Sequence, residues 1–269
     1  MSLKVSRRLH RLANPIRAAQ LDGALATLTG GGTEILMVHS SLSACGGFTA
    51  GPEGVLSGLR KHCGTLVLPT QSYCYPVNPG EPGPLFQAAT TPSQNGLLTE
   101  VFRSQPGVLR SIHATHALAV EGPMATEVCE GHYLNDSPCG PGTPYSRLIQ
   151  RRVSALMFGV NFLYYTFFHT AEFESGSDAA FEHGTRDWLR VIDEQGVERD
   201  CFSRRQSRSP MRFAEAGELL EHKGLVSRAQ LGRGVLWYVP DCSKVHDFLL
   251  ERLRRTPDFL RHSCRSPLQ

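Results

Sequence analysis

The stretch Glu34-Ile-Leu-Met-Val-His39, continued by Ser40-Ser41, is a short apolar run that ends in small polar residues. Its length and the glycines at positions 30–32 are typical of a buried strand. Residues 51–62 follow with a helical pattern, and Thr65-Leu-Val-Leu68 is a second buried run. Strand, loop, helix and strand in this order form a βαβ unit, which predicts a parallel sheet.

The rest of the chain adds helices and strands around this unit. Residues 73–93 are rich in proline and predict a long loop without regular structure. A hairpin is expected around Glu194-Gln-Gly196. The other predicted helices are 15–29, 95–104, 211–222, 241–254 and one from Pro144, and the other predicted strands are 117–120, 153–160 and 226–238. We therefore expect an α/β fold with a largely parallel central sheet flanked by helices and an antiparallel C-terminal portion.

Composition excludes several classes of protein. Of 269 residues, 41% are hydrophobic and 20% are charged, as in a folded globular protein. The net charge of +3 is too balanced to indicate a nucleic-acid partner, and no apolar run is long enough to predict a membrane span. Eight cysteines without a CxxC pair, and a basic N-terminus without the apolar stretch of a signal peptide, predict a cytoplasmic protein with reduced thiols.

Polar or small segments follow three of the predicted strands: His39-Ser-Ser41, Pro69-Thr-Gln-Ser72 and Gly159-Val-Asn161. Ligands bind α/β sheets at the carboxyl ends of their strands, so we expect the site there. Residues 39–47 combine hydroxyls and glycines between a strand and a helix, an arrangement that can cradle a phosphate. The spacing fits neither a Walker loop nor GxGxxG, so an ordinary capped loop stays an alternative.

His169-Thr-Ala-Glu172 is the second candidate motif. If residues 164–173 are helical, His169 and Glu172 share one face, and a carboxylate beside an imidazole fixes its tautomer and raises its basicity. Such a pair suits general base catalysis near neutral pH. A structural histidine paired with a surface carboxylate is the alternative, which the surrounding tyrosines and phenylalanines at 164–168 make less favoured.

Two further kinds of site, a metal site and a covalent Cys/His site, have weaker support in the sequence. His113 and His116 precede a strand, but no third ligand stands at metal-binding spacing, so no metal is predicted. Cys45 or Cys139 paired with a histidine would allow an acyl-enzyme intermediate, although no GxSxG elbow occurs.

Several segments taken together resemble the aminoglycoside N(3)-acetyltransferase family, the antibiotic N-acetyltransferase type. They occur in the family's order between about residues 15 and 185: 36–43, 69–72, 90–92, 107–111 with His113, 122–123, 142–144 with 147–148, 158–160, and Thr166 with His169 and Glu172. The resemblance implies a single domain over 1–269, with a CoA-binding and catalytic core at 15–185 and a C-terminal portion at 186–269.

The resemblance also implies that an acceptor amine attacks the thioester of acetyl-CoA directly, with no metal and no covalent intermediate. The segment matching Val38 to Gly46 contacts CoA in the family, as do the residues matching Thr70, Arg110 and Ser111. His169 is the expected base, Glu172 its support, and His113 lies near the reacting centre. The CoA-binding candidates within the first segment are His39, Ser40, Ser41, Leu42 and Ser43.

Three departures from the family pattern stand out: two weaken close kinship without touching His169, and the third concerns the acceptor. Ala114 stands where the family has proline, and Gln71 where it has histidine. Aminoglycosides are polycations, yet the loop at 73–93 holds Glu81 as its one acidic residue. The acceptor is therefore an aminoglycoside, an amino sugar or another small amine. A Cys/His hydrolase or ligase, or a CoA-binding protein without catalysis, are the alternatives, and a monomer or homodimer is expected.

Overall fold

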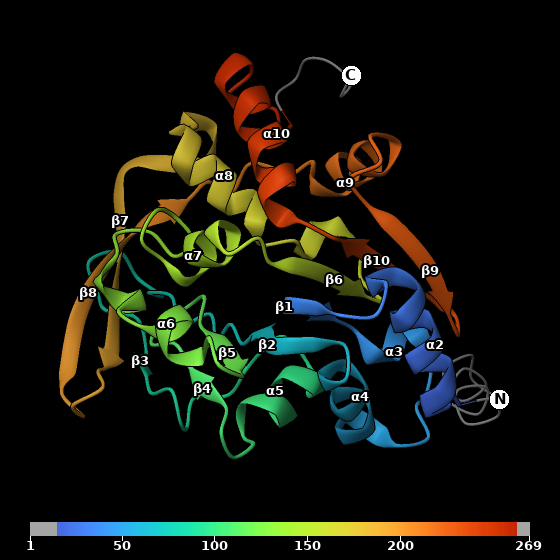
Figure 1. Ribbon diagram of the computed structural model, residues 1–269. Coiled ribbons are helices and arrows are strands. Elements are labelled where there is room, and N and C mark those ends of the chain that lie inside the picture. The colour runs from blue at the N-terminus through green and yellow to red at the C-terminus, as the bar shows by residue number, and fades with distance from the viewer. Residues whose placement is uncertain (1–14, 263–269) are drawn as a thin grey trace, which may run out of the picture.

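The computed structural model describes residues 15–262 and is built on a seven-stranded sheet with the order β4-β5-β2-β1-β6-β10-β9 (Figure 1). β1 and β2 are the two runs from which the βαβ unit was predicted. The strands are β1 (Thr33–Ser40), β2 (Cys63–Pro69), β4 (Leu109–Arg110), β5 (Leu118–Glu121), β6 (Ser154–Phe158), β9 (Ser227–Leu231) and β10 (Gly234–Val239).

Parallel pairing is confined to the middle of the sheet. β1 pairs in parallel with β2 and with β6, so that Ile35 lies opposite Thr65 and Val38 opposite Leu156. β5, β4, β10 and β9 pair antiparallel on the two sides. The α/β class is confirmed, but the antiparallel part is not limited to the C-terminal portion, because β4 and β5 also belong to it.

Alternate residues of β1 face two helical layers, as the pleat of a strand requires. Leu36 and Val38 pack in one hydrophobic cluster, and Ile35 and Met37 in the other. The first layer holds α2 (Ala18–Thr29), α3 (Leu42–Cys45), α4 (Gly51–Arg60) and α5 (Leu97–Arg103). The second holds α6 (Ala125–Cys129), α7 (Pro144–Gln150), α8 (Phe167–Ser175), α9 (Phe213–His222) and α10 (Cys242–Arg255). In Figure 1, α4 and α5 lie below the sheet and α8 and α10 above it.

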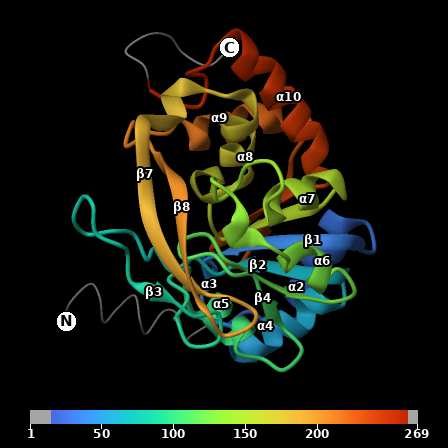
Figure 2. The ribbon, with the colours of Figure 1, turned by 90° about the vertical axis from the view of Figure 1, so that its left-hand side faces the viewer.

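A second, three-stranded sheet has the order β3-β7-β8. The long hairpin of β7 (Phe181–Ile192) and β8 (Glu198–Gln206) stands beside the main sheet, as Figure 2 shows. The segment predicted as an irregular loop contains β3 (Leu85–Phe86), which pairs in parallel with β7. Phe86 is fully buried with Leu189 and Val191, so the hairpin anchors this proline-rich segment.

Two elements differ from the prediction. The predicted strand at 226–238 is a hairpin of β9 and β10 rather than one strand, because Gly232 turns the chain in the left-handed region at φ 58°. The helix expected from Tyr164 begins at Phe167, after a 3₁₀ turn over Phe162–Tyr164. Within residues 15–262, no helix has the length and apolar character needed to cross a membrane. The basic segment at the N-terminus lies outside the described residues.

Candidate active site

A cleft of about 1090 Å³ opens at the carboxyl ends of β1, β2 and β6. Its lining includes Ser40, Gln71, Asn161 and His169. The structure thus brings together the three strand ends that the sequence indicated, and it adds α8 to them. The five predicted CoA-binding residues His39, Ser40, Ser41, Leu42 and Ser43 all line this cleft.

The loop after β1 is held against β6 by close backbone contact. The N–H of Ser41 donates to the carbonyl of Phe158 over 2.8 Å. A Cβ atom at Gly159 would lie 2.7 Å from the Ser41 carbonyl oxygen and 2.8 Å from Cys45 Sγ, and this residue has a φ of 69°. Only glycine fits such an approach without displacement, so Gly159 allows the two strand ends to share one cleft.

His169, Glu172 and Arg261 form a chain of charged contacts behind the cleft. Nδ1 of His169 lies 2.8 Å from Oε2 of Glu172. Nε of Arg261 donates to Oε1 of Glu172 over 2.6 Å, and its Nη2 donates to Oε2 over 2.8 Å. Glu172 and Arg261 are buried, whereas the His169 side chain keeps 14% of its surface exposed. The pair predicted from the sequence is therefore present and has a third member.

The charges around Glu172 determine which nitrogen of His169 carries the hydrogen. Burial opposes ionisation of Glu172, but hydrogen bonds and charges from His169 and Arg261 outweigh it and hold the pKa of Glu172 below its ordinary value. An ionised carboxylate only accepts hydrogen bonds, so Nδ1 of neutral His169 carries the hydrogen. Nε2 then has a free lone pair, as a general base requires.

Sequence analysis missed Arg261. It lies 89 residues after Glu172 and follows α10, where arginines are common and no motif distinguishes one of them. Its Nη1 also donates to the backbone carbonyl of Ser209 over 3.1 Å. Arg261 therefore ties the C-terminal part of the chain to α8 directly behind His169.

His113 lies behind the cleft rather than in it. Its Nδ1 accepts hydrogen bonds from the backbone N–H groups of Thr115 and His116, and its ring centroid is 4.4 Å from that of His132. His116, the other histidine of this segment, lines the cleft together with His169. The structure thus brings His116, rather than His113, to the cleft surface.

Ser111, another predicted CoA-binding residue, is fully buried beside these histidines. Its hydroxyl donates to Nδ1 of His132 over 2.9 Å and accepts from the N–H of Leu118. Nε2 of His132 lies 2.8 Å from the carbonyl of Pro138, which can only accept, so Nε2 carries a hydrogen. Burial lowers the pKa of this ring to about 3, so it is neutral with both nitrogens engaged. Ser111 does not line the cleft.

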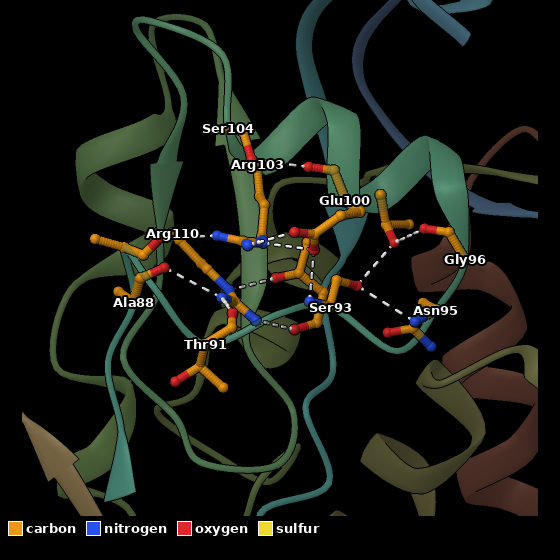
Figure 3. Close-up of polar contacts among 12 residues, drawn as sticks. Ala88, Thr91, Ser93, Asn95, Gly96, Glu100, Arg103, Ser104 and Arg110 are labelled. Carbon is orange, nitrogen blue, oxygen red and sulfur yellow. Dashed lines mark hydrogen bonds and ion pairs between the residues drawn. The ribbon is translucent and has the colours of Figure 1, made fainter.

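Thr70 and Arg110 also lie outside the cleft lining and bond to each other. Nε of Arg110 donates to Oγ1 of Thr70 over 3.0 Å, and Nη1 donates to the carbonyls of Ala88 and Thr91 (Figure 3). The guanidinium group is therefore occupied by loop backbone. It fixes residues 88–91 against the end of β2.

The thiols of the covalent alternative are buried. Cys45 is 1% exposed, and burial raises the pKa of its thiol to about 11. Burial also raises the pKa of Cys139 well above its ordinary value. Both thiols are protonated at neutral pH, and a protonated thiol is a poor nucleophile. In the part of the chain that the structure describes, no group of three or more His, Cys, Asp or Glu side chains could hold a metal ion.

Fold and site together define an α/β enzyme whose cleft carries a histidine backed by an ionised carboxylate. The chain belongs to the aminoglycoside 3-N-acetyltransferase family, an acyltransferase family whose model matches residues 37–254. The aminoglycoside N(3)-acetyltransferase VIII of Streptomyces fradiae is 27% identical over 215 residues, which cover 69% of this chain and 73% of that protein.

Solved structures agree with this assignment. A complex of the aminoglycoside acetyltransferase AAC(3)-IVa with gentamicin has a TM-score of 0.77 and 25% identity, with 93% of each chain covered. A binary complex of AAC-IIIb with CoASH has a TM-score of 0.78 and 21% identity, and covers 94% of this chain and all of the other. At its lower identity, the second comparison concerns the fold alone.

Proposed function

We propose that this protein transfers an acetyl group from acetyl-CoA to an amine of a small molecule, with His169 as the general base. The observation that carries the proposal is the Arg261–Glu172–His169 chain, which ends in an unengaged Nε2 at the cleft. Nε2 has no hydrogen-bond partner within residues 15–262. A buried ion pair behind a half-buried histidine stabilises the imidazolium that forms when His169 takes up a proton.

The reaction balances with this one base. The acceptor nitrogen attacks the thioester carbonyl carbon, a C–N bond forms, and the C–S bond breaks with CoA leaving as its thiolate. The proton of the attacking nitrogen passes to Nε2 of His169 and then to the departing sulfur. No acyl-enzyme forms, which agrees with the protonated thiols of Cys45 and Cys139.

The donor is assigned to the segment His39–Ser43 on the evidence of its position in the cleft. His39 is 3% exposed, and burial lowers its pKa to about 3, so its ring is neutral. Its Nε2 has no hydrogen-bond partner among the described residues, although buried polar atoms rarely lack one. His39 also lines the cleft, so this end of β1 faces the space that a donor would occupy. Membership of the aminoglycoside 3-N-acetyltransferase family supports an acetyl donor.

Thr70, Arg110 and Ser111 act on this site through the loops that they hold. None lines the cleft, and each is engaged by other protein groups. His113 likewise shapes the backbone at Thr115 and His116, and His116 is the histidine that can contact a bound ligand. The names of relatives make aminoglycosides or amino sugars the first acceptors to examine.

The test combines thiol release with mass spectrometry. Purified protein is incubated with acetyl-CoA and a panel of primary amines, and free CoA and product mass are measured. We expect release of CoA to depend on amine and the product to gain one acetyl group. Release without amine, together with an acetylated cysteine in the protein, would instead establish the covalent hydrolase, and binding of CoA without any release would establish a non-catalytic protein.

A further inference from the structure

We propose that the acceptor is a monoamine with an aromatic or apolar body, and that polycationic aminoglycosides are poor substrates. This inference rests on the proposed function, because it concerns what the same cleft accepts. It follows from the charges and the side chains that surround His169.

The lining of the cleft carries no formal charge apart from what its histidines can acquire. Among the residues that the structure describes, none that lines the cleft is Asp, Glu, Lys or Arg. An aminoglycoside carries several ammonium groups, and each loses hydration when it enters a protein cleft. Without carboxylates, only neutral oxygen atoms can replace that hydration, whereas a monoamine brings a single ammonium group to desolvate.

The acidic side chains next to the cleft are already neutralised. Glu172 is paired with Arg261 on both of its oxygens. Asp187 lines a neighbouring hollow that shares Tyr75 and Gln206 with the cleft, but it is 4% exposed and lies 2.7 Å from Arg205.

That hollow also holds an unneutralised cation. Arg208 is exposed there and has no ion-pair partner within residues 15–262. Together with the paired Asp187 and Arg205, it gives the hollow a net positive charge. This side of the cleft therefore repels a polycation rather than attracting one.

Apolar side chains form much of the cleft surface. Tyr164 is 58% exposed, Tyr73 45%, Leu163 41% and Met211 37%, and all four line the cleft. Large apolar side chains grouped in a concave site are typical of ligand contact. Phe213 extends this surface inward to His169, with ring centroids 5.0 Å apart. An aromatic or aliphatic body would therefore pack directly beside the base.

Tyr73 has an unfavourable backbone conformation, and a hydrogen bond from its side chain holds it in that conformation. Its φ of 50° is unusual for a residue other than glycine. Its hydroxyl donates to Oε1 of Gln71 over 2.7 Å, and the same oxygen accepts from Nδ2 of Asn95. Gln71 is the residue that replaces the histidine of the family pattern.

The Asn95 amide belongs in turn to a wider network. Ser93 Oγ accepts from the N–H of Asn95, and the N–H of Ser93 donates to Glu100, as Figure 3 shows. A strained residue fixed by several contacts is typical of a functional position. We therefore assign Tyr73 as a specificity residue whose ring contacts the acceptor.

The test compares acceptors in one assay. We expect kcat/KM, measured by CoA release, to be at least about tenfold higher for 2-phenylethylamine than for kanamycin, with glucosamine between them. A higher kcat/KM for kanamycin would overturn the inference and leave the proposed function intact. Absence of release with all three amines would overturn the proposed function and the inference with it.

Variants of Tyr73 test whether this residue sets the preference among acceptor amines. Tyr73→Ala should raise KM for 2-phenylethylamine about tenfold and leave KM for acetyl-CoA unchanged, while Tyr73→Phe, which keeps the ring, should retain most of the affinity. Tyr73→Glu should shift the preference toward kanamycin by adding a carboxylate. Phe202→Ala removes an exposed ring outside the cleft lining and serves as the control. Equal kinetics in Tyr73→Ala and Phe202→Ala would contradict the assignment of Tyr73.

Discussion

Two groups of histidines lie beside the same cleft, but their surroundings differ. His169 is partly exposed and backed by Glu172 and Arg261. His113, His116 and His132 are nearly or fully buried. Burial, together with neighbouring imidazoles, lowers the pKa of His116 to about 3, and burial lowers that of His132 to about 3.

The comparison separates the proposed base from the histidines that hold the surrounding structure. A proton that arrives at His169 meets the negative charge of Glu172, whereas a proton at His132 would meet a neutral serine and a backbone carbonyl in a buried site. The same side chain can therefore exchange protons in one place and must remain neutral in the other. A histidine motif alone does not distinguish the two roles. What distinguishes them is the group bound to the other ring nitrogen, which is a carboxylate at Nδ1 of His169 and a backbone carbonyl at Nε2 of His132.

The largest expected effect comes from removing the base. His169→Ala should lower kcat by about 100- to 10,000-fold, because the acceptor nitrogen then has no positioned proton acceptor. Affinity for acetyl-CoA, measured by calorimetry, should change little. The matched control is His222→Ala, an exposed histidine on α9. If both variants turned over alike, His169 would belong with the structural histidines and the comparison would fail.

A smaller effect is expected from Arg261. Arg261→Met leaves the Glu172 carboxylate buried with one partner fewer, which should lower the free energy of unfolding by about 3–5 kcal/mol, as for other broken buried ion pairs. Urea titration measures this loss. Adding Glu172→Gln removes the unpaired charge and should restore much of the stability but not the activity.

The ion-pair account of the His169 cluster predicts this separation of stability from activity. A double variant no more stable than Arg261→Met would show that Arg261 acts by packing alone.

The smallest effect concerns the dependence of stability on pH. The folded-state pKa of His132 is about 3, below its ordinary 6.5, so the unfolded chain binds the proton first. The stability linked to this group is present above pH 6.5 and is lost as the pH falls from 6.5 toward 3. His132→Asn should reduce the slope of the unfolding free energy in that window by up to about 1.4 kcal/mol per pH unit.

Urea titrations at several pH values measure this slope. His222→Asn serves as the matched control, since that side chain is exposed in the folded state. An unaltered slope in His132→Asn would mean that His132 accepts a proton without unfolding, and the contrast with His169 would lose its basis.

Periodicity and strand-end chemistry predicted most of what positions the site. The βαβ unit around β1 and the cleft at three strand ends followed from apolar runs that stop at small polar residues, since both features are local. The antiparallel pairing of β5 with β2 was not predicted, because nothing in residues 117–120 records the direction of a neighbouring strand. The β9–β10 hairpin was missed although Gly232-Arg-Gly234, a typical turn sequence, interrupts residues 226–238.

Prediction of the site failed where the partner lies far along the chain. His169 and Glu172 are three residues apart and were found together, whereas Arg261 had no signal. Arg110 carries a charge that suits a phosphate, yet it is enclosed by the carbonyls of Ala88 and Thr91. The sequence does not show where residues 88–91 lie, so only the structure shows that the Arg110 guanidinium already donates to their carbonyl groups.

The distance between Glu172 and Arg261 along the chain has a consequence for synthesis. The arginine is made 89 residues after the carboxylate that it neutralises. At about 5–20 residues per second, a ribosome needs roughly 4–18 s to cover that interval. During this time the Glu172 carboxylate lacks the arginine that neutralises it, so the ion pair behind His169 can form only after the far end of the chain has emerged. Completion of the contacts among Arg261, Glu172 and His169 is therefore a late event in the synthesis of the protein.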